Sequence, residues 1–180
     1  MRTFVPEYPH PYMTRSGYDR GKTRDMTAHT YDVTITWTGN RGEGTTGIRD
    51  YDRDHTIAAD GPPAIEGTAD PGFLGDPKRW NPEQLFTASI SQCHMLWYLG
   101  LCARAGVVVH EYADEAVGTM VSEPGNTARF TEVVLRPRIV VGAPDQVEKA
   151  VALHEKAHEM CFIAQSVNFE VKHDPEVVSG

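Results

Sequence analysis

The chain has 180 residues with 17 Lys and Arg against 25 Asp and Glu, which gives a formal net charge of −8 at pH 7. Nucleic acids are held through clustered Lys and Arg, so this balance argues against a nucleic-acid partner. No apolar run approaches the roughly 18 residues that cross a bilayer, and the N-terminal residues lack the apolar core of a secretory signal. Three cysteines do not make a secreted disulfide framework. We therefore expect a cytoplasmic protein with reduced thiols, without a membrane partner.

The N-terminal part of the chain divides into an extension and the start of a domain. Residues 1–27 are rich in Pro, Arg and Lys and show no helical or strand period, so we expect a mobile extension there and one domain over 28–180. Apolar side chains alternate with Thr and Asp over 29–38, which predicts a half-buried strand. One or two further short strands are expected in 45–58. The Pro-rich segment 59–80 is predicted as a long loop.

The stretch 81–106 predicts a single long helix. Asn81 is a good N-cap, and Gly106 supplies the left-handed residue that commonly ends a helix. Between them the sequence is apolar on nearly every side, which is typical of a buried helix. The prediction places Cys93 at the centre of this buried helix and Glu83 in its first turn.

The remaining elements complete an α+β arrangement. A hairpin is expected between strands at 112–122 and 127–141, around the turn Glu-Pro-Gly-Asn. Within its second strand, one face carries Val133, Leu135, Ile139 and Val141. Helical spacing of apolar residues predicts a second helix at 144–161, and a last strand is expected at 166–172. The order of strands, helix, strands, helix and strand is that of an α+β fold.

The three cysteines differ in their predicted surroundings. Cys102 follows Cys93 by nine residues, or two and a half helical turns, so the two face opposite sides of the helix. Free cysteine is usually a small buried hydrophobe, which is the reading for Cys102 and, from composition alone, also for Cys93. Cys161 lies where the second helix ends. If the two helices pack together, Cys93 and Cys161 could approach to disulfide range, as a peroxidatic and a resolving thiol.

Three parts of the sequence resemble the OsmC/Ohr family of small thiol-dependent peroxidases. They are TWTGNRGEG at 36–44, NPEQLFTASISQC at 81–93, and Cys161 on a helix that leads into a last strand. The resemblance covers roughly residues 28–175 and is specific in the NPEQLF motif. It implies an OsmC-like α+β fold with antiparallel sheets wrapped around a long central helix. It also implies an intertwined homodimer with its active site at the interface, and reduction of organic hydroperoxides to alcohols.

The resemblance assigns four site residues. Cys93 matches the peroxidatic cysteine, Cys161 the resolving one, Arg41 the active-site arginine and Glu83 the acid of the NPEQ motif. A guanidinium beside the sulfur favours the reactive thiolate, and a carboxylate would fix the direction of that guanidinium. No bound cofactor is implied. The expected reductant is an external dithiol, and the family points to lipoyl groups on proteins.

Helix geometry adds a constraint on Glu83. Ten residues separate Glu83 from Cys93, which is about 15 Å along a continuous helix at ~1.5 Å per residue. Glu83 therefore reaches the Cys93 of its own chain only if the helix begins well after it. Otherwise the carboxylate comes from the partner subunit, and an active protein is an obligatory dimer.

Several positions depart from the family pattern. Phe162 follows the resolving cysteine, where the family often has proline, and the residues after the peroxidatic cysteine are bulkier than expected: His94, Trp97 and Tyr98. We expect Phe86, Trp97 and Phe162 to line the substrate pocket, with plain core packing as the alternative. The departures leave open a stress-response or binding module that keeps the fold with little turnover.

A rival motif lies in the second helix. His154, Glu155 and His158 satisfy H-E-x-x-H, the spacing of a zinc hydrolase, with a third ligand sought among Glu170, His173 and Glu176. Matches of this length are common by chance, and Glu155 belongs to a charge pattern typical of a solvated face. We therefore expect no metal.

Overall fold

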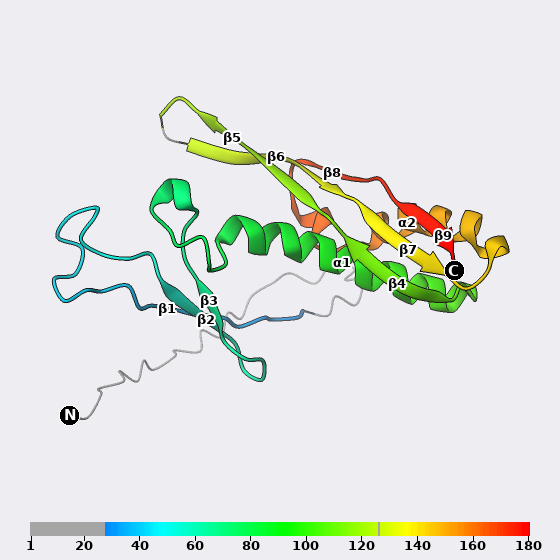
Figure 1. Ribbon diagram of the computed structural model, residues 1–180, viewed down its shortest axis with the longest axis horizontal. Coiled ribbons are helices and arrows are strands. Elements are labelled where there is room, and N and C mark those ends of the chain that lie inside the picture. The colour runs from blue at the N-terminus through cyan, green and yellow to red at the C-terminus, as the bar shows by residue number, and fades with distance from the viewer. Residues whose placement is uncertain (1–27, 126) are drawn as a thin grey trace, which may run out of the picture. The chain divides into compact units, whose positions relative to one another are not determined.

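The computed structural model describes residues 28–125 and 127–180, and Val33–Gly180 form one compact unit. The prediction for residues 1–27 lies outside the described residues. Within them the chain has two α-helices and three three-stranded sheets, which confirms the α+β prediction (Figure 1). No helix in this part of the chain is long and apolar enough to span a membrane.

The long helix α1 spans Pro82–Ala105, as its terminal signals predict. The side-chain oxygen of Asn81 accepts from Gln84 N at 2.8 Å, and Gln84 Oε1 accepts from Asn81 N at 3.2 Å. Together these bonds form a capping box. At the other end Gly106 has φ 73°, a left-handed conformation in which glycine is unstrained. Local chemistry therefore fixes both ends of the helix.

Only one face of α1 is buried, and the prediction of a helix buried all round is wrong. Fully buried side chains recur at every fourth residue: Ile90, His94, Tyr98 and Cys102. Leu96 is 63% exposed, and Cys93 is half-buried rather than buried. A row spaced by four is one stripe of a helix, because such residues lie above one another. Other apolar side chains of α1, among them Trp97, Leu99 and Leu101, are only partly buried.

The second helix, α2, spans Val147–Met160 and packs on α1. A short 3-10 helix, η2 (Pro144–Gln146), precedes it, so the predicted helix at 144–161 is nearly correct. Its buried side chains are Ala150, His154 and Ala157. Small residues at two of these positions allow the two helices to approach closely.

Two of the sheets lie along α1 (Figure 1). One contains β4 (Val109–Asp114), β7 (Pro137–Val141) and β9 (Glu176–Ser179); the other contains β5 (Val117–Glu123), β6 (Thr127–Leu135) and β8 (Glu170–His173). The pairs β4–β7 and β5–β6 are antiparallel, but β8 pairs with β6 and β9 pairs with β7 in parallel. The expectation of antiparallel sheets is therefore wrong for the outer strands. The predicted last strand, 166–172, is replaced by η3 (Ala164–Ser166), β8 and β9.

Each predicted hairpin strand is in fact two strands. The second breaks before Pro137, which has no N–H to donate to a ladder. Asp114 supports the break, since its Oδ1 accepts from Arg136 N at 2.7 Å while its Oδ2 accepts from Ser91 of α1. The expected apolar face is buried as predicted but is shared by two sheets: Val133, Leu135, Ile139 and Val141.

The third sheet contains β1 (Thr34–Trp37), β2 (His55–Ala58) and β3 (Ile65–Gly67), all antiparallel. The predicted strand at 29–38 is shorter than expected and is exposed rather than half-buried, with Ile35 60% and Trp37 43% exposed. The predicted loop at 59–80 holds β3 and a short 3-10 helix, η1 (Pro71–Phe73). The alternation correctly predicted a strand, but its residues are exposed, although the Trp37 ring meets that of Tyr51 edge to face with centroids 5.7 Å apart.

Candidate active site

Packing of α2 on α1 brings two of the three cysteines together. Cys93 is half-exposed in the middle of α1, and Cys161 is fully buried at the C-terminal end of α2. The Cys161 thiol donates to the Ile90 carbonyl at 3.9 Å, and the Cys93 thiol is near enough to contribute to the raised pKa of Cys161. The two cysteines that the sequence singles out therefore share one site.

The two thiols differ in their electrostatics. Burial raises the pKa of Cys161 to about 11; backbone hydrogen bonding at Ala164 lowers it in part, and the neighbouring Cys93 thiol raises it further. A buried thiol resists ionisation because the thiolate loses its hydration. Cys161 therefore stays protonated at neutral pH, and solvent reaches the pair at Cys93.

Cys102 lies on the opposite side of α1 and is 1% exposed. Burial raises the pKa of this thiol, which fits an inert structural cysteine. It belongs to the core cluster formed by α1, α2 and the β4–β7–β9 sheet, with Tyr98, Ile139 and Val141 among its members. The prediction that Cys102 is a buried hydrophobe is confirmed.

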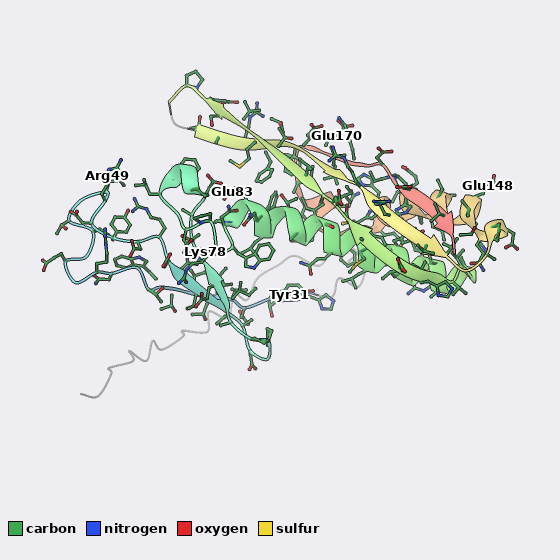
Figure 2. The ribbon with its side chains drawn as sticks, in the orientation of Figure 1. Tyr31, Arg49, Lys78, Glu83, Glu148 and Glu170 are labelled. Atoms are coloured by element: carbon green, nitrogen blue, oxygen red, sulfur yellow. The ribbon has the colours of Figure 1, made fainter. Side chains whose placement is uncertain are left out.

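Arg41 lies in the loop between β1 and β2, the loop in which Figure 2 labels Arg49. Its guanidinium donates to the carbonyls of Asp50, at 3.2 Å, and Arg49, and its Nε lies 3.8 Å from a carboxylate oxygen of Asp52. The loop lies beyond the N-terminal end of α1, away from the middle of that helix where Cys93 stands (Figure 1). The fold of one chain does not bring Arg41 to Cys93.

Glu83 lies in the first turn of α1 (Figure 2). The helix runs without a break from Glu83 to Cys93, so about 15 Å separates them along the axis. Glu83 Oε2 is buried and has no hydrogen-bond partner among the described residues. It lines a groove of about 870 Å³ beside the β5–β6 hairpin, with Thr87, Ser91 and Phe130 among the other lining residues. A buried carboxylate oxygen without a partner is costly, so this group is expected to meet a cation or donor.

The three expected pocket aromatics divide between two places. Phe86 packs on Phe130 and Phe169, with ring centroids 4.9 and 6.0 Å apart, inside the core cluster under β5, β6 and β8. Trp97 and Phe162 meet edge to face at 5.3 Å, and Phe162 is 68% exposed. Trp97 follows Cys93 by one helical turn and Phe162 follows Cys161 directly. Trp97 and Phe162 therefore lie beside the cysteine pair, and Phe86 does not.

A group of buried histidines was missed as a unit by the sequence reasoning. His94 of α1 and His154 of α2 are 1% and 0% exposed, and His94 Nε2 lies 3.0 Å from His154 Nδ1. His158 and His173 lie beside them, with His173 at ring-centroid distances of 5.7 Å from His94 and 5.6 Å from His158. The available signal was the position of His94 in the buried row, four residues after Ile90 and four before Tyr98.

The H-E-x-x-H residues lie in this group, but the geometry differs from that of a chelate. The rings of His94 and His154 are parallel within 8°, so the two facing nitrogens share a hydrogen bond. Of the other expected ligands, Glu170 pairs with Lys172 at 3.3 Å and Glu176 with Arg138 at 3.1 Å. In the described part of the chain, no three or more His, Cys, Asp or Glu side chains are placed to hold a metal ion.

The chain thus combines an α+β fold with a half-exposed cysteine on its long helix and a buried cysteine near it. A family model described as OsmC-like protein matches residues 75–176, so the chain belongs to the OsmC-like protein family. An OsmC-like protein of unknown function from Vibrio cholerae is 32% identical, with a TM-score of 0.74 over 82% of this chain and 99% of its own.

Two more distant structures carry functional names. An organic hydroperoxide resistance protein from Elizabethkingia anophelis, with thiocyanate bound, is 22% identical, with a TM-score of 0.62 over 86% of this chain and 99% of that one. A putative organic hydroperoxide resistance protein from Vibrio cholerae, with captopril bound in one of its active sites, is 19% identical; its TM-score is 0.59 over 86% of this chain and 95% of that one. At these identities the likeness shows the fold. No curated protein matches this chain.

Proposed function

We propose that the protein is a thiol peroxidase that reduces organic hydroperoxides to alcohols through Cys93 and Cys161. The observation that carries this proposal is the proximity of a half-exposed thiol on α1 and a buried thiol at the end of α2. The names of two structurally similar proteins, an organic hydroperoxide resistance protein and a putative one, support the same chemistry. Cytoplasmic residence with reduced thiols is part of the proposal.

The difference between the thiols assigns their roles. The Cys93 thiolate attacks one peroxide oxygen, the O–O bond breaks, and the departing alkoxide takes a proton to become the alcohol. Cys93 is then a sulfenic acid. Cys161, held protonated by burial, condenses with it; a disulfide forms and the sulfenic hydroxyl leaves as water with the Cys161 proton. An external dithiol, such as a lipoyl group on a protein, reduces the disulfide by exchange and is itself oxidised.

Activation of Cys93 requires a cation, which we assign to Arg41 of a second copy of the chain. Within one chain, Arg41 stays with its own loop and Glu83 lies about 15 Å along α1 from Cys93. The unpartnered oxygen of Glu83 and the groove beside it favour a second chain that supplies the missing contacts. At the Cys93 of one chain, Arg41 and Glu83 of the second chain would then meet, and their pairing would aim the guanidinium at the thiolate.

The exposed apolar surface also supports a homodimer. The β1 side chains Ile35 and Trp37 are 60% and 43% exposed, and Leu96 of α1 is 63% exposed. Exposed apolar patches of this kind commonly mark protein interfaces. An intertwined dimer would cover both the β1–β2–β3 sheet and the outer side of α1.

The substrate's apolar tail is assigned to the aromatic pair beside the cysteines. The ring centroids of Trp97 and Phe162 lie 5.3 Å apart. Trp97 lies one helical turn after Cys93, and Phe162 follows Cys161 directly. Their edge-to-face contact leaves ring surface open at Phe162, which is 68% exposed. Bulky aromatic side chains favour an apolar alkyl or aryl hydroperoxide over hydrogen peroxide.

A Cys93→Ser variant tests the proposal. Purified protein is assayed with tert-butyl hydroperoxide and dihydrolipoamide, and both peroxide loss and alcohol formation are measured. Wild type and a Cys102→Ser control are expected to turn over, since Cys102 is buried away from the site, whereas Cys93→Ser is expected to show only the uncatalysed rate. Equal rates in wild type and Cys93→Ser would end the peroxidase proposal and favour a non-catalytic binding module.

A further inference from the structure

Four imidazoles meet where α1, α2 and β8 come together. His94 and His154 are fully buried, and His158 and His173 are partly buried. Ring centroids of His94, His154 and His158 lie 5.7, 6.1 and 5.6 Å from that of His173. The disulfide chemistry proposed above uses none of these rings. A group of four imidazoles in the interior of a 180-residue chain therefore requires its own explanation.

The central pair is held by one shared proton. His94 Nε2 and His154 Nδ1 face each other at 3.0 Å with parallel rings, a geometry that needs one N–H donor and one bare nitrogen. The other nitrogens of both rings, His94 Nδ1 and His154 Nε2, are buried without a hydrogen-bond partner among the described residues. If both rings became cations, two N–H groups would point at each other and the bond would be lost.

The surroundings oppose protonation of this pair. Burial lowers the pKa of His94 to about 4, with the charges of His173 and His158 as further causes. Burial also lowers the pKa of His154 to about 3, with His94 and His173 as further causes.

The groups that face the pair come from four elements. From α1, the ring of Tyr98 stacks on that of His154 with centroids 3.9 Å apart, and Tyr112 of β4 lies next to Tyr98 with ring centroids 5.9 Å apart. The others are His158 and Glu155 of α2 and His173 of β8. The only carboxylate among these, Glu155, lies 3.4 Å from His173 and is itself largely exposed. The pair therefore lacks a carboxylate of its own that would stabilise a cation.

The pair also connects the two cysteines. His94 follows Cys93 in α1, and His154 precedes Cys161 by seven residues, or two helical turns, in α2. We propose that the His94–His154 bond positions Cys161 against Cys93, and that protonation of both rings in acid releases the end of α2 and separates the two thiols. This inference deepens the proposed function, on which it rests for the role of the cysteine pair.

Exposure of Cys161 as a function of pH tests the proposal without peroxide. In a Cys93→Ser/Cys102→Ser background, Cys161 is the one thiol left, and 4,4′-dithiodipyridine reports its exposure in acid and at neutrality. Relative to a free cysteine peptide, the rate is expected to rise by about tenfold or more between about pH 7 and pH 4.5, with native circular dichroism. A flat profile, or a rise that coincides with loss of all secondary structure, overturns the proposal.

A matched variant isolates the two rings. In His94→Gln/His154→Asn, amides replace the facing nitrogens and can still hydrogen-bond, but they do not titrate. This variant is expected to lose the acid-dependent rise, whereas His110→Gln, a change at an exposed histidine of β4, is expected to keep it. An unchanged rise in the double variant contradicts the proposal.

The wild-type protein provides a readout if the double variant does not fold. In a pH titration followed by histidine ring NMR signals, His94 and His154 are expected to stay neutral at about pH 5 and to protonate where Cys161 becomes reactive. Titration of both rings near the ordinary histidine pKa of about 6.5 would overturn the proposal. None of these readouts depends on turnover, so a failed peroxidase assay and a failed release are distinguishable.

Discussion

Mixed dimers of two damaged variants test whether Glu83 serves the Cys93 of the partner chain. Cys93→Ser removes the nucleophile. Glu83→Gln keeps the size of the side chain but removes its charge, and with it the charge-assisted pairing proposed with Arg41. A lost bond of this kind costs about 1.5–3 kcal/mol, so we expect kcat/KM of the Glu83→Gln homodimer to fall by about 10- to 100-fold.

The structure sets the size of the expected recovery. Glu83 and Cys93 lie about 15 Å apart along the unbroken α1, so in the proposed dimer each complete site combines Cys93 of one chain with Glu83 of the other. A mixed dimer then has one intact site, from Cys93 of the Glu83→Gln chain and Glu83 of the Cys93→Ser chain. Random pairing makes about half of all dimers mixed, so about a quarter of wild-type activity is expected, rising to about half for purified mixed dimers.

The assay uses co-expression of the two chains with different affinity tags, successive purification on both tags, and hydroperoxide turnover per mole of dimer. Separately purified homodimers of each variant are the controls. If Glu83 acted within its own chain, both sites of a mixed dimer would be damaged and activity would not exceed that of Glu83→Gln. That result, or full activity of a monomer at high dilution, would refute the reasoning.

Three further predictions concern stability, each measured by urea unfolding. His94 and His154 have pKa values lowered in the folded state, so below the ordinary pKa of about 6.5 the unfolded chain binds more protons than the folded one. The free energy of unfolding therefore decreases as pH falls. Two such groups give it a slope approaching about 2.7 kcal/mol per pH unit near pH 5. A pH-independent stability between about pH 7 and 5 would contradict this account. Asn81→Ala removes the capping box and is expected to lower the free energy of unfolding by about 1–2 kcal/mol at constant m-value. A decrease below about 0.3 kcal/mol would show that the cap does not stabilise the fold. Asp114→Ala removes the hydrogen bonds that Asp114 accepts from Ser91 of α1 and from Arg136 N between β6 and β7, and it is expected to lower the free energy of unfolding by about 1–3 kcal/mol. A neutral effect would show that the two hydrogen bonds are dispensable.

Elements with complete local signals were predictable from the sequence. Asn81 and Gly106 mark the ends of α1, and the structure caps the helix at both residues. The split of the hairpin strands was predictable only in part: Pro137 is a local signal for the break, but the hydrogen bond that Asp114 accepts from Arg136 across the sheet has none. The strand β9 is four residues long and pairs in parallel with β7, a pairing without a turn signal in the sequence. Local chemistry therefore predicted the helices better than the sheets.

The candidate site was predictable in part for the same reason. The sequence predicted that Cys93 and Cys161 approach each other if the two helices pack together. In the structure α1 and α2 do pack together, and the two cysteines are neighbours. The prediction that Cys93 is buried was wrong, because the apolar composition of α1 does not show which side of the helix its own chain covers. The contact of His94 with His154 joins residues sixty positions apart, and no local pattern indicates it.

The central claim, that Cys93 is oxidised and then resolved by Cys161, is tested most directly by disulfide mapping. Reduced protein is treated with one equivalent of tert-butyl hydroperoxide, blocked with an alkylating reagent in acid, digested and analysed by mass spectrometry. The account predicts a Cys93–Cys161 linked peptide as the main product, with Cys102 alkylated, and one alcohol formed per disulfide. A disulfide through Cys102, or both thiols of the pair recovered in reduced form after the peroxide is consumed, would contradict it.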